Sequence, residues 1–193
     1  MGRAEACLCY SAHTAMKLGR RNGKDERLKQ FARRIQEMAR KDEERRRQAA
    51  AIQAIRLRAA AELHALCARF VESVNQLLEK PMLELSPPDW ADAYYRDSAP
   101  NVFQLAMAGR IVHLEFRAPE ALISTERFRT PYVLEGAVRA FNQEMLDLAV
   151  VPERLLFCCL EGDTPRWVWF DPRTQRTAPL DEEHLIALFE RLL

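Results

Sequence analysis

Apolar residues recur every three or four positions along one long stretch of the chain, residues 25–79. Steps of three and four from Leu28 to Leu77 pass fifteen positions, and twelve of these are apolar when alanine is counted. A spacing near 3.5 keeps one seam of a helix facing a partner helix as the two supercoil. The stretch lacks Gly and Pro and consists mostly of good helix formers. The pattern predicts one coiled-coil-like helix, about 80 Å long at 1.5 Å per residue.

The predicted seam is interrupted by charge and widens toward its end. Asp42, Arg45 and Arg56 occupy seam positions, where a buried, unpaired charge would cost several kcal/mol. We therefore expect these middle turns to be solvated. Beyond Ala49 the wider apolar stripe is typical of a helix packed on a globular body. The helix should thus have a charged, projecting half and a docked half, and the predicted partner-binding seam consists of Leu28, Phe31, Ile35, Met38, Ile52, Leu63, Leu66 and Phe70.

After Pro81 the apolar period changes from 3.6 to 2, which indicates strands. Residues 102–107 and 110–117 alternate on either side of a two-residue connection, Ala108-Gly109, and predict an antiparallel hairpin. Residues 154–160 and 166–170 predict a second hairpin. Because residues 154–160 are apolar on both faces, they should form a central strand.

The segment 131–149 fits two structures. Leu134, Val138, Phe141 and Met145 lie on one narrow helical stripe, whereas Gly136 and the residues before it suit an extended strand. The pattern favours a helix and leaves the strand open. Further on, Asp181 is a candidate N-cap for a C-terminal helix with an acidic first turn.

The fold class predicted from these elements is α+β. A long N-terminal, coiled-coil-like helix should precede a small antiparallel-sheet domain of four or five strands with one or two packed helices. The expected organisation is a disordered lead-in (1–24), the long helix (25–80), a linker with a short helical turn (81–100) and the α+β domain (101–193). Residues 1–15 lack a clear pattern, so one hypothesis is that translation begins at Met16.

Charge and cysteine content narrow the possible settings. Met1 to Lys80 carries 18 Lys and Arg against 10 Asp and Glu, a net +8, whereas Pro81 to Leu193 carries 11 against 18, a net −7. A basic arm joined to an acidic body favours an anionic partner for the arm or association between the two. The five cysteines form no even disulfide framework, and no apolar run approaches ~18 residues. We therefore expect a reducing, cytoplasmic setting and no membrane partner.

Catalytic chemistry finds little support in the sequence. Phosphate loops, dinucleotide fingerprints and nucleophile elbows are absent, so we predict no catalytic residue, no cofactor and no metal site. Cys7-x-Cys9 with His13 lacks a fourth ligand. His113 with Glu115 is more typical of a solvated strand face, and His184 is expected to be exposed. Trp167 and Trp169 share one strand face, which favours core beneath a helix over the alternative, an aromatic platform for a ligand.

The leading functional hypothesis is a non-enzymatic interaction protein that pairs with itself or with another protein through the long helix and the body. An alternative is association with nucleic acid through the basic half of the helix. A third, an enzyme in the α+β body, has no residue constellation behind it. The possible phosphate contacts are Arg33, Arg34, Arg40, Lys41, Arg45, Arg46 and Arg47, but interleaved acidic residues favour the solvated flank of a coiled coil.

Overall fold

The computed structural model describes residues 9–119, 124, 128–142, 149–162 and 164–193, with side chains from Gly23 onward and, within β5, from Arg154. Its contacts form two units, Met1–Ala50 and Ala51–Leu193. In chain order the elements are α1 (Cys9–Leu77), β1 (Glu84–Ser86), the 3-10 helix η1 (Asp92–Tyr94), β2 (Asn101–Met107), β3 (Arg110–Arg117), β4 (Tyr132–Asn142), β5 (Ala149–Glu161), β6 (Thr164–Asp171), β7 (Arg176–Pro179) and α2 (Glu182–Glu190). The predicted α+β class, with its long N-terminal helix, is confirmed.

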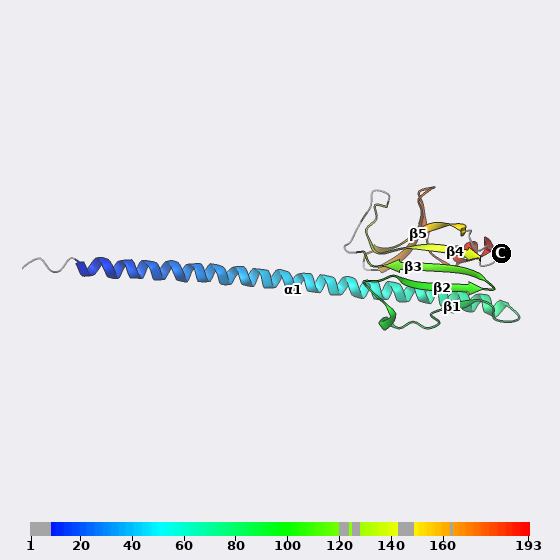
Figure 1. Cartoon of the computed structure of the whole chain (residues 1–193), viewed down its shortest axis with the longest axis horizontal. Helices are drawn as coiled ribbons and strands as arrows, with labels where there is room; N and C mark the ends of the chain where they lie inside the picture. Colours follow the sequence, from blue (N-terminus) through cyan, green and yellow to red (C-terminus); the bar gives the residue numbers. More distant parts are fainter. Residues whose placement is uncertain (1–8, 120–123, 125–127, 143–148, 163) are drawn as a thin grey trace, which may run out of the picture. The chain divides into compact units, whose positions relative to one another are not determined.

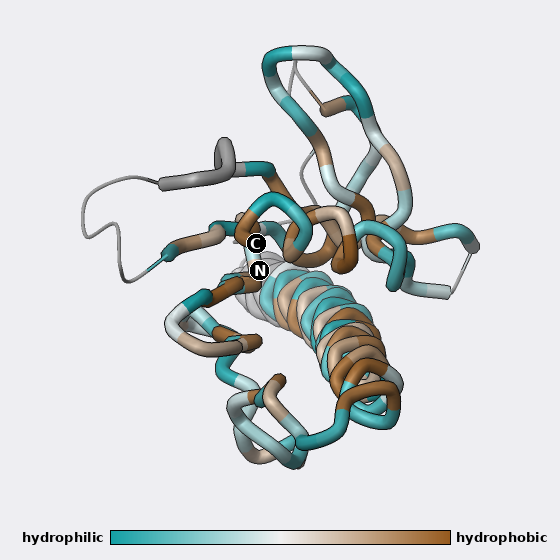
Figure 2. The backbone as a smooth tube through the Cα atoms, turned by 90° about the vertical axis from the view of Figure 1, so that its right-hand side faces the viewer, coloured by the Kyte–Doolittle hydropathy of each residue, from teal (hydrophilic) through white to brown (hydrophobic). Residues whose placement is uncertain are grey.

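The long helix agrees with its apolar pattern, which Figure 2 shows as alternating brown and teal positions along α1. It ends at Leu77, close to the predicted end. The predicted lead-in, residues 1–24, overlaps α1 from Cys9 onward, and residues 1–8 lie outside the described residues. After the helix, the side-chain oxygen of Asn75 accepts hydrogen bonds from the backbone N–H groups of Met82 and Leu83, both at 3.0 Å. These bonds fix the reversal that leads into β1.

Within the described residues, the sheet is an antiparallel meander of seven strands in the order β1-β2-β3-β4-β5-β6-β7. Figure 1 shows β1 to β5 side by side with the C-terminal part of α1 along them. The predicted hairpin is confirmed: β2 and β3 pair from Asn101↔Phe116 to Met107↔Arg110. Its turn has positive φ at both Ala108 (45°) and Gly109 (79°), as a two-residue turn that matches strand twist requires. The sheet exceeds the predicted four or five strands because β1 and β7, three and four residues long, are too short to show an alternating pattern.

The favoured helix at 131–149 is wrong, because Tyr132–Asn142 is strand β4. Its register against β5 shifts between Tyr132 and Leu134, between Val138 and Ala140, and between Ala140 and Phe141. Such bulges interrupt the strict period of two. The buried positions therefore form a run of three, a run of two and the single residue Ala140, so that Leu134, Ala137 and Val138 have the spacing of a helical stripe. Residues 143–148 of this prediction lie outside the described residues.

We call the second unit, Ala51–Leu193, the body. Its core lies between one face of the sheet and the two helices. Ala59, Leu63, Cys67 and Phe70 of α1 pack with sheet residues such as Leu114 in a single buried cluster. The N-cap of α2 is confirmed, since the Asp181 side chain accepts a hydrogen bond from the His184 N–H at 2.9 Å. The docked half of the helix therefore belongs to this core.

The central position of β5 is confirmed, because each of its faces is buried in a different cluster. Leu156 and Cys158 belong to the core beneath α1, and Phe157 and Cys159 to a smaller cluster on the far face. The far-face cluster consists of Phe128, Tyr132, Phe157, Cys159 and Phe170. Toward β2–β4 the same face becomes polar, with a 3.0 Å ion pair between Arg139 and Glu115. Burial raises the pKa of Cys159 to about 11, so its thiol stays protonated near neutral pH.

Candidate functional site

The predicted seam divides into a covered and an uncovered part. Leu63 and Phe70 are buried in the body at 0% and 4% exposure, and Ile52 and Leu66 are partly buried. By contrast, every described side chain from Gly23 to Ala50 is exposed. The uncovered part contains four large apolar side chains at heptad spacing: Leu28 (56% exposed), Phe31 (62%), Ile35 (48%) and Met38 (62%). We call these four residues the apolar stripe.

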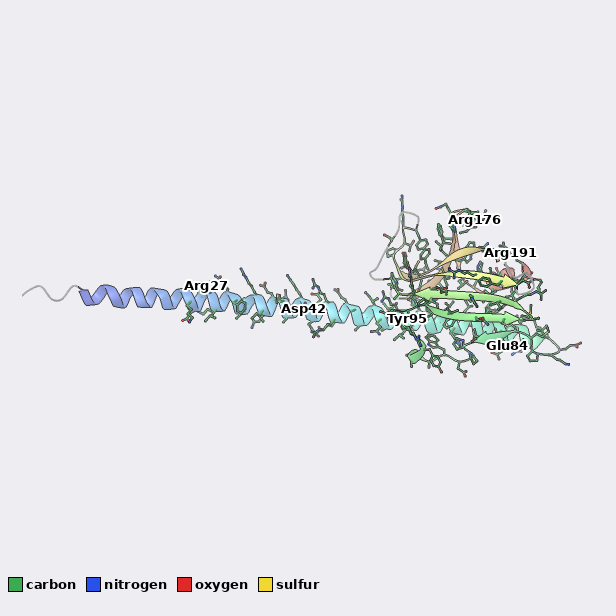
Figure 3. The ribbon with its side chains drawn as sticks, in the orientation of Figure 1. Arg27, Asp42, Glu84, Tyr95, Arg176 and Arg191 are labelled. Carbon is green, nitrogen blue, oxygen red and sulfur yellow. The ribbon has the colours of Figure 1, made fainter. Side chains whose placement is uncertain are left out.

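The apolar stripe is narrow, and its two flanks differ. On one side, Ala32 and Ala39 are small enough for a second backbone to come close. On the other side, Arg27, Arg34 and Lys41 form a continuous basic edge, which we call the basic flank. A stripe confined to positions separated by three and four residues is the geometry of a two-helix seam. Figure 3 labels Arg27 and Asp42, whose side chains stand out from the helix.

The charged residues of the same segment are of both signs. Arg47 donates to Glu43 at 3.1 Å and Arg45 lies 3.8 Å from Asp42, so two of the candidate phosphate-binding residues have acidic neighbours. The candidates Arg33, Arg34, Arg40, Lys41, Arg45, Arg46 and Arg47 are all exposed. Arg33, Arg40 and Arg47 are seven residues apart and share one line along the helix, whereas Arg34 and Lys41 belong to the basic flank. Glu37 and Glu44 lie between these two basic lines, so the lines do not merge into one basic face.

Arg56 corrects the expectation that the charged seam positions are solvated. It is only 9% exposed and is held by the body. Its Nε donates to the Val133 carbonyl at 3.0 Å, Nη2 donates to the Pro119 carbonyl at 2.9 Å, and Nη1 donates to both carboxylate oxygens of Asp97 at 3.1 Å. A buried arginine is stable when its N–H groups find acceptors in this way. Asp42 and Arg45, in contrast, are exposed as expected.

Beside Arg56 lies an open pocket of about 640 Å³ that is lined by both charged and apolar residues. Its wall includes the ion pair between Arg117 and Glu135, at 3.1 Å, and Glu135 also accepts a 3.1 Å hydrogen bond from the Tyr132 hydroxyl. The charged groups that line it thus bind one another. This arrangement is typical of a structural network that joins the helix to the loops of the sheet.

The two tryptophans of β6 face the helices. Trp167 is 6% exposed, and its Nε1 donates to the Ala59 carbonyl of α1 at 2.8 Å. Trp169 stacks on His184 of α2 with ring centroids 4.8 Å apart, and the Arg154 guanidinium lies 4.3 Å from the Trp169 ring. Trp167 therefore presents no ring to a ligand.

His113, which we considered as a base, is bonded within the sheet. Its Nε2 lies 2.8 Å from the Gln104 side-chain oxygen, and its ring is edge-on to Phe141. Burial lowers its pKa, while the neighbouring Glu115 raises it by less. Among the described residues, no three His, Cys, Asp or Glu side chains converge as metal ligands. Within the same residues, no helix combines the length and apolar character needed to cross a bilayer.

His184 is buried at 7% exposure rather than exposed as expected, because Trp169 covers its ring. Burial, then the Arg154 charge, lowers its pKa from 6.5 to about 4, and Asp181 only partly opposes this. With the folded pKa below the unfolded one, the neutral ring contributes stability that is full above pH 6.5 and is lost as the pH falls toward 4.

We expect the free energy of unfolding to drop between pH 7.5 and pH 5 by about 2 kcal/mol more in the native chain than in a His184→Phe variant. The variant keeps an aromatic ring against Trp169 but removes the titration, so other titrating groups, including His113, cancel in the comparison. Urea unfolding followed by tryptophan fluorescence at both pH values measures the difference. Equal pH dependence in the two proteins would show that folding leaves the pKa of His184 near 6.5.

Comparison with known proteins returned no matching family model, no matching curated protein and no matching solved structure.

Proposed function

We propose that this chain is a non-enzymatic interaction protein that binds another helix along the apolar stripe of α1. The observation that carries the proposal is the exposure of four large apolar side chains at coiled-coil spacing, 48–62% each, on a segment whose every described side chain is exposed. Burying them against a second helix would remove most of this apolar surface from water, at about 25 cal/mol per Å².

The edges of the sheet are poorly suited to binding a partner, which favours α1 as the binding element. The edge strand β1 has three residues and is followed directly by Pro87, and the other edge strand, β7, has four and ends at Pro179. Short edges that end in proline discourage strand addition by a partner. The charged groups around Arg56 already satisfy one another, as described above.

Association with nucleic acid is the second candidate and rests on the exposure of all seven candidate arginine and lysine residues. Asp42 and Glu43 compete with phosphate for two of them. This candidate requires an affinity that falls steeply with salt, because each phosphate contact releases a counterion. A pairing through the apolar stripe would change much less between 50 and 200 mM salt.

Photo-cross-linking from two faces of the helix tests the proposal. A benzoylphenylalanine in place of Phe31 points along the apolar stripe, and one in place of Arg33 points to the opposite face of the helix. We expect cross-links to a helical peptide from the first position only, and their loss when Ile35→Asp is added. Equal yields from both faces, or yields unaffected by Ile35→Asp, would count against a paired helix at this stripe.

A further inference from the structure

From the charges beside the apolar stripe we infer that its partner is an amphipathic helix with acidic flanking residues, and not a second copy of this chain. This inference rests on the function proposed above and adds the chemistry of the partner. Two copies of the chain could pair in parallel or in antiparallel orientation, and both orientations bring like charges together.

Parallel self-pairing would bring like charges together. In a parallel pair each seam residue faces the same residue of the other copy. The apolar stripe would match itself, but the next two seam positions would place Asp42 opposite Asp42 and Arg45 opposite Arg45. The flanking residues Lys41 and Arg46 would also face each other across the seam. Like charges at seam and flanking positions oppose pairing.

Antiparallel self-pairing has the same difficulty at the basic flank. When the apolar stripes of two copies are aligned, Leu28 lies opposite Met38 and Phe31 lies opposite Ile35. These pairs form apolar layers. One flank would then place Arg34 beside Arg34 and Arg27 beside Lys41. The favourable contact in this register is Lys24 with Asp42, and its attraction is offset by the cost of removing both charges from water at seam positions. The repulsive contacts therefore outnumber the attractive ones.

A partner with Glu or Asp at the positions that face Arg27, Arg34 and Lys41 satisfies the same geometry without repulsion. Those three side chains are exposed. Opposite charges at flanking positions set the choice of partner in paired helices. The small side chains of Ala32 and Ala39 on the other flank let the partner come close. The narrow stripe also argues against a lipid surface, because helices that lie on membranes present a broad apolar face.

Synthetic helical peptides of four heptads, with Leu and Ile at the seam, serve as probes. One peptide carries Glu at every flanking position, and a matched peptide carries Lys there. Fluorescence anisotropy with the full chain at 150 mM salt measures both affinities. We expect the Glu peptide to bind at least about tenfold more tightly, since three exposed ion pairs replace three repulsive contacts.

Two variants separate the role of charge from that of the apolar seam. The triple change Arg27→Glu, Arg34→Glu and Lys41→Glu should reverse the preference, so that the Lys peptide binds more tightly. The double change Leu28→Asn and Ile35→Asn should abolish binding of both peptides. All five side chains are exposed, so these variants should keep the fold, and circular dichroism checks this.

The possible results separate the acidic character of the partner from helix pairing itself. Equal binding of the two peptides, or tight self-association in sedimentation equilibrium at micromolar concentration, would overturn the acidic partner while keeping helix pairing. Binding of neither peptide without self-association would overturn both. Stripe-dependent binding to phosphatidylserine vesicles without any preference for the Glu peptide would assign the apolar stripe to a membrane surface and overturn the inference.

Discussion

Replacing Gly136 by alanine will destabilise the body by at least about 3 kcal/mol. Gly136 of β4 lies opposite Phe116 of β3. A Cβ at this position would lie 2.8 Å from the Phe116 Cα and would also clash with the Glu115 carbonyl oxygen. Both contacts are with backbone, so no side chain can turn away. The two central strands would have to separate, at the cost of their hydrogen bonds and of the core packed beneath them.

Gly162→Ala is the control that separates backbone strain from the steric overlap expected in Gly136→Ala. At Gly162 a Cβ would meet nothing within 4 Å, but φ is +66°. Gly162→Ala therefore tests backbone strain without steric overlap and should cost about 1 kcal/mol. Urea unfolding of both variants, read by far-ultraviolet circular dichroism, gives the two values. If Gly136→Ala costs no more than Gly162→Ala, the close approach of β3 and β4 described above is incorrect.

Substitution of Arg56 by methionine is expected to destabilise the body by about 3 kcal/mol. Methionine keeps the apolar part of the side chain but removes the donors to the Val133 and Pro119 carbonyls and to Asp97. The Val133 and Pro119 carbonyls then lose the arginine donor near the core. Because this arginine bonds three separate segments to α1, local hydrogen exchange around Asp97 and Val133 should also increase.

The matched control for Arg56 is Asp97→Asn, which removes the negative charge and leaves both carbonyl contacts intact. The Asp97 side chain is 46% exposed, so its loss should cost only about 1 kcal/mol. Thermal and urea unfolding of the two variants give the order of the effects. Arg56→Met at native stability would show that an apolar side chain replaces the guanidinium without loss, as happens in some buried ion pairs.

The features that could be predicted from the sequence depend on local, repeated signals. The long helix follows from fifty-five residues without Gly or Pro and with a seam of period 3.5. The turn at Ala108-Gly109 separates two alternating runs, and Asp181 precedes an acidic first turn with an apolar face. In each case neighbouring residues suffice to determine the local structure, so the pattern is visible without knowledge of the fold.

The features that were missed depend on contacts between distant segments. Arg56 becomes buried because Val133, 77 positions further along the chain, supplies an acceptor. His184 of α2 becomes buried because Trp169 of β6 stacks on it. In β4 the bulges hide the alternation of the strand. None of these contacts leaves a local signal, so single-sequence reasoning favours the solvated or helical alternative at each position.

For the candidate site on α1, the sequence pattern gives the residues of the seam, and the structure gives the exposure of each one. The heptad spacing predicts a seam of eight residues, and the wider apolar face beyond Ala49 predicts that the second half of the helix is docked. The structure places Leu63 and Phe70 in the core and leaves Leu28 and Phe31 exposed. The binding hypothesis therefore narrows from the whole seam to its first four residues.

The order of the elements also determines how the chain must behave while it is being made. The docked part of α1 emerges from the ribosome before any strand, yet its core partners extend to Trp167 in β6 and Phe189 in α2. At 5–20 residues per second, roughly 5–20 s pass before these last partners are synthesised. During that interval the apolar face of the nascent helix is uncovered, which exposes it to aggregation. Slowing translation after α1 should therefore increase aggregation of the nascent chain, whereas the aggregation of protein that has already folded should not change.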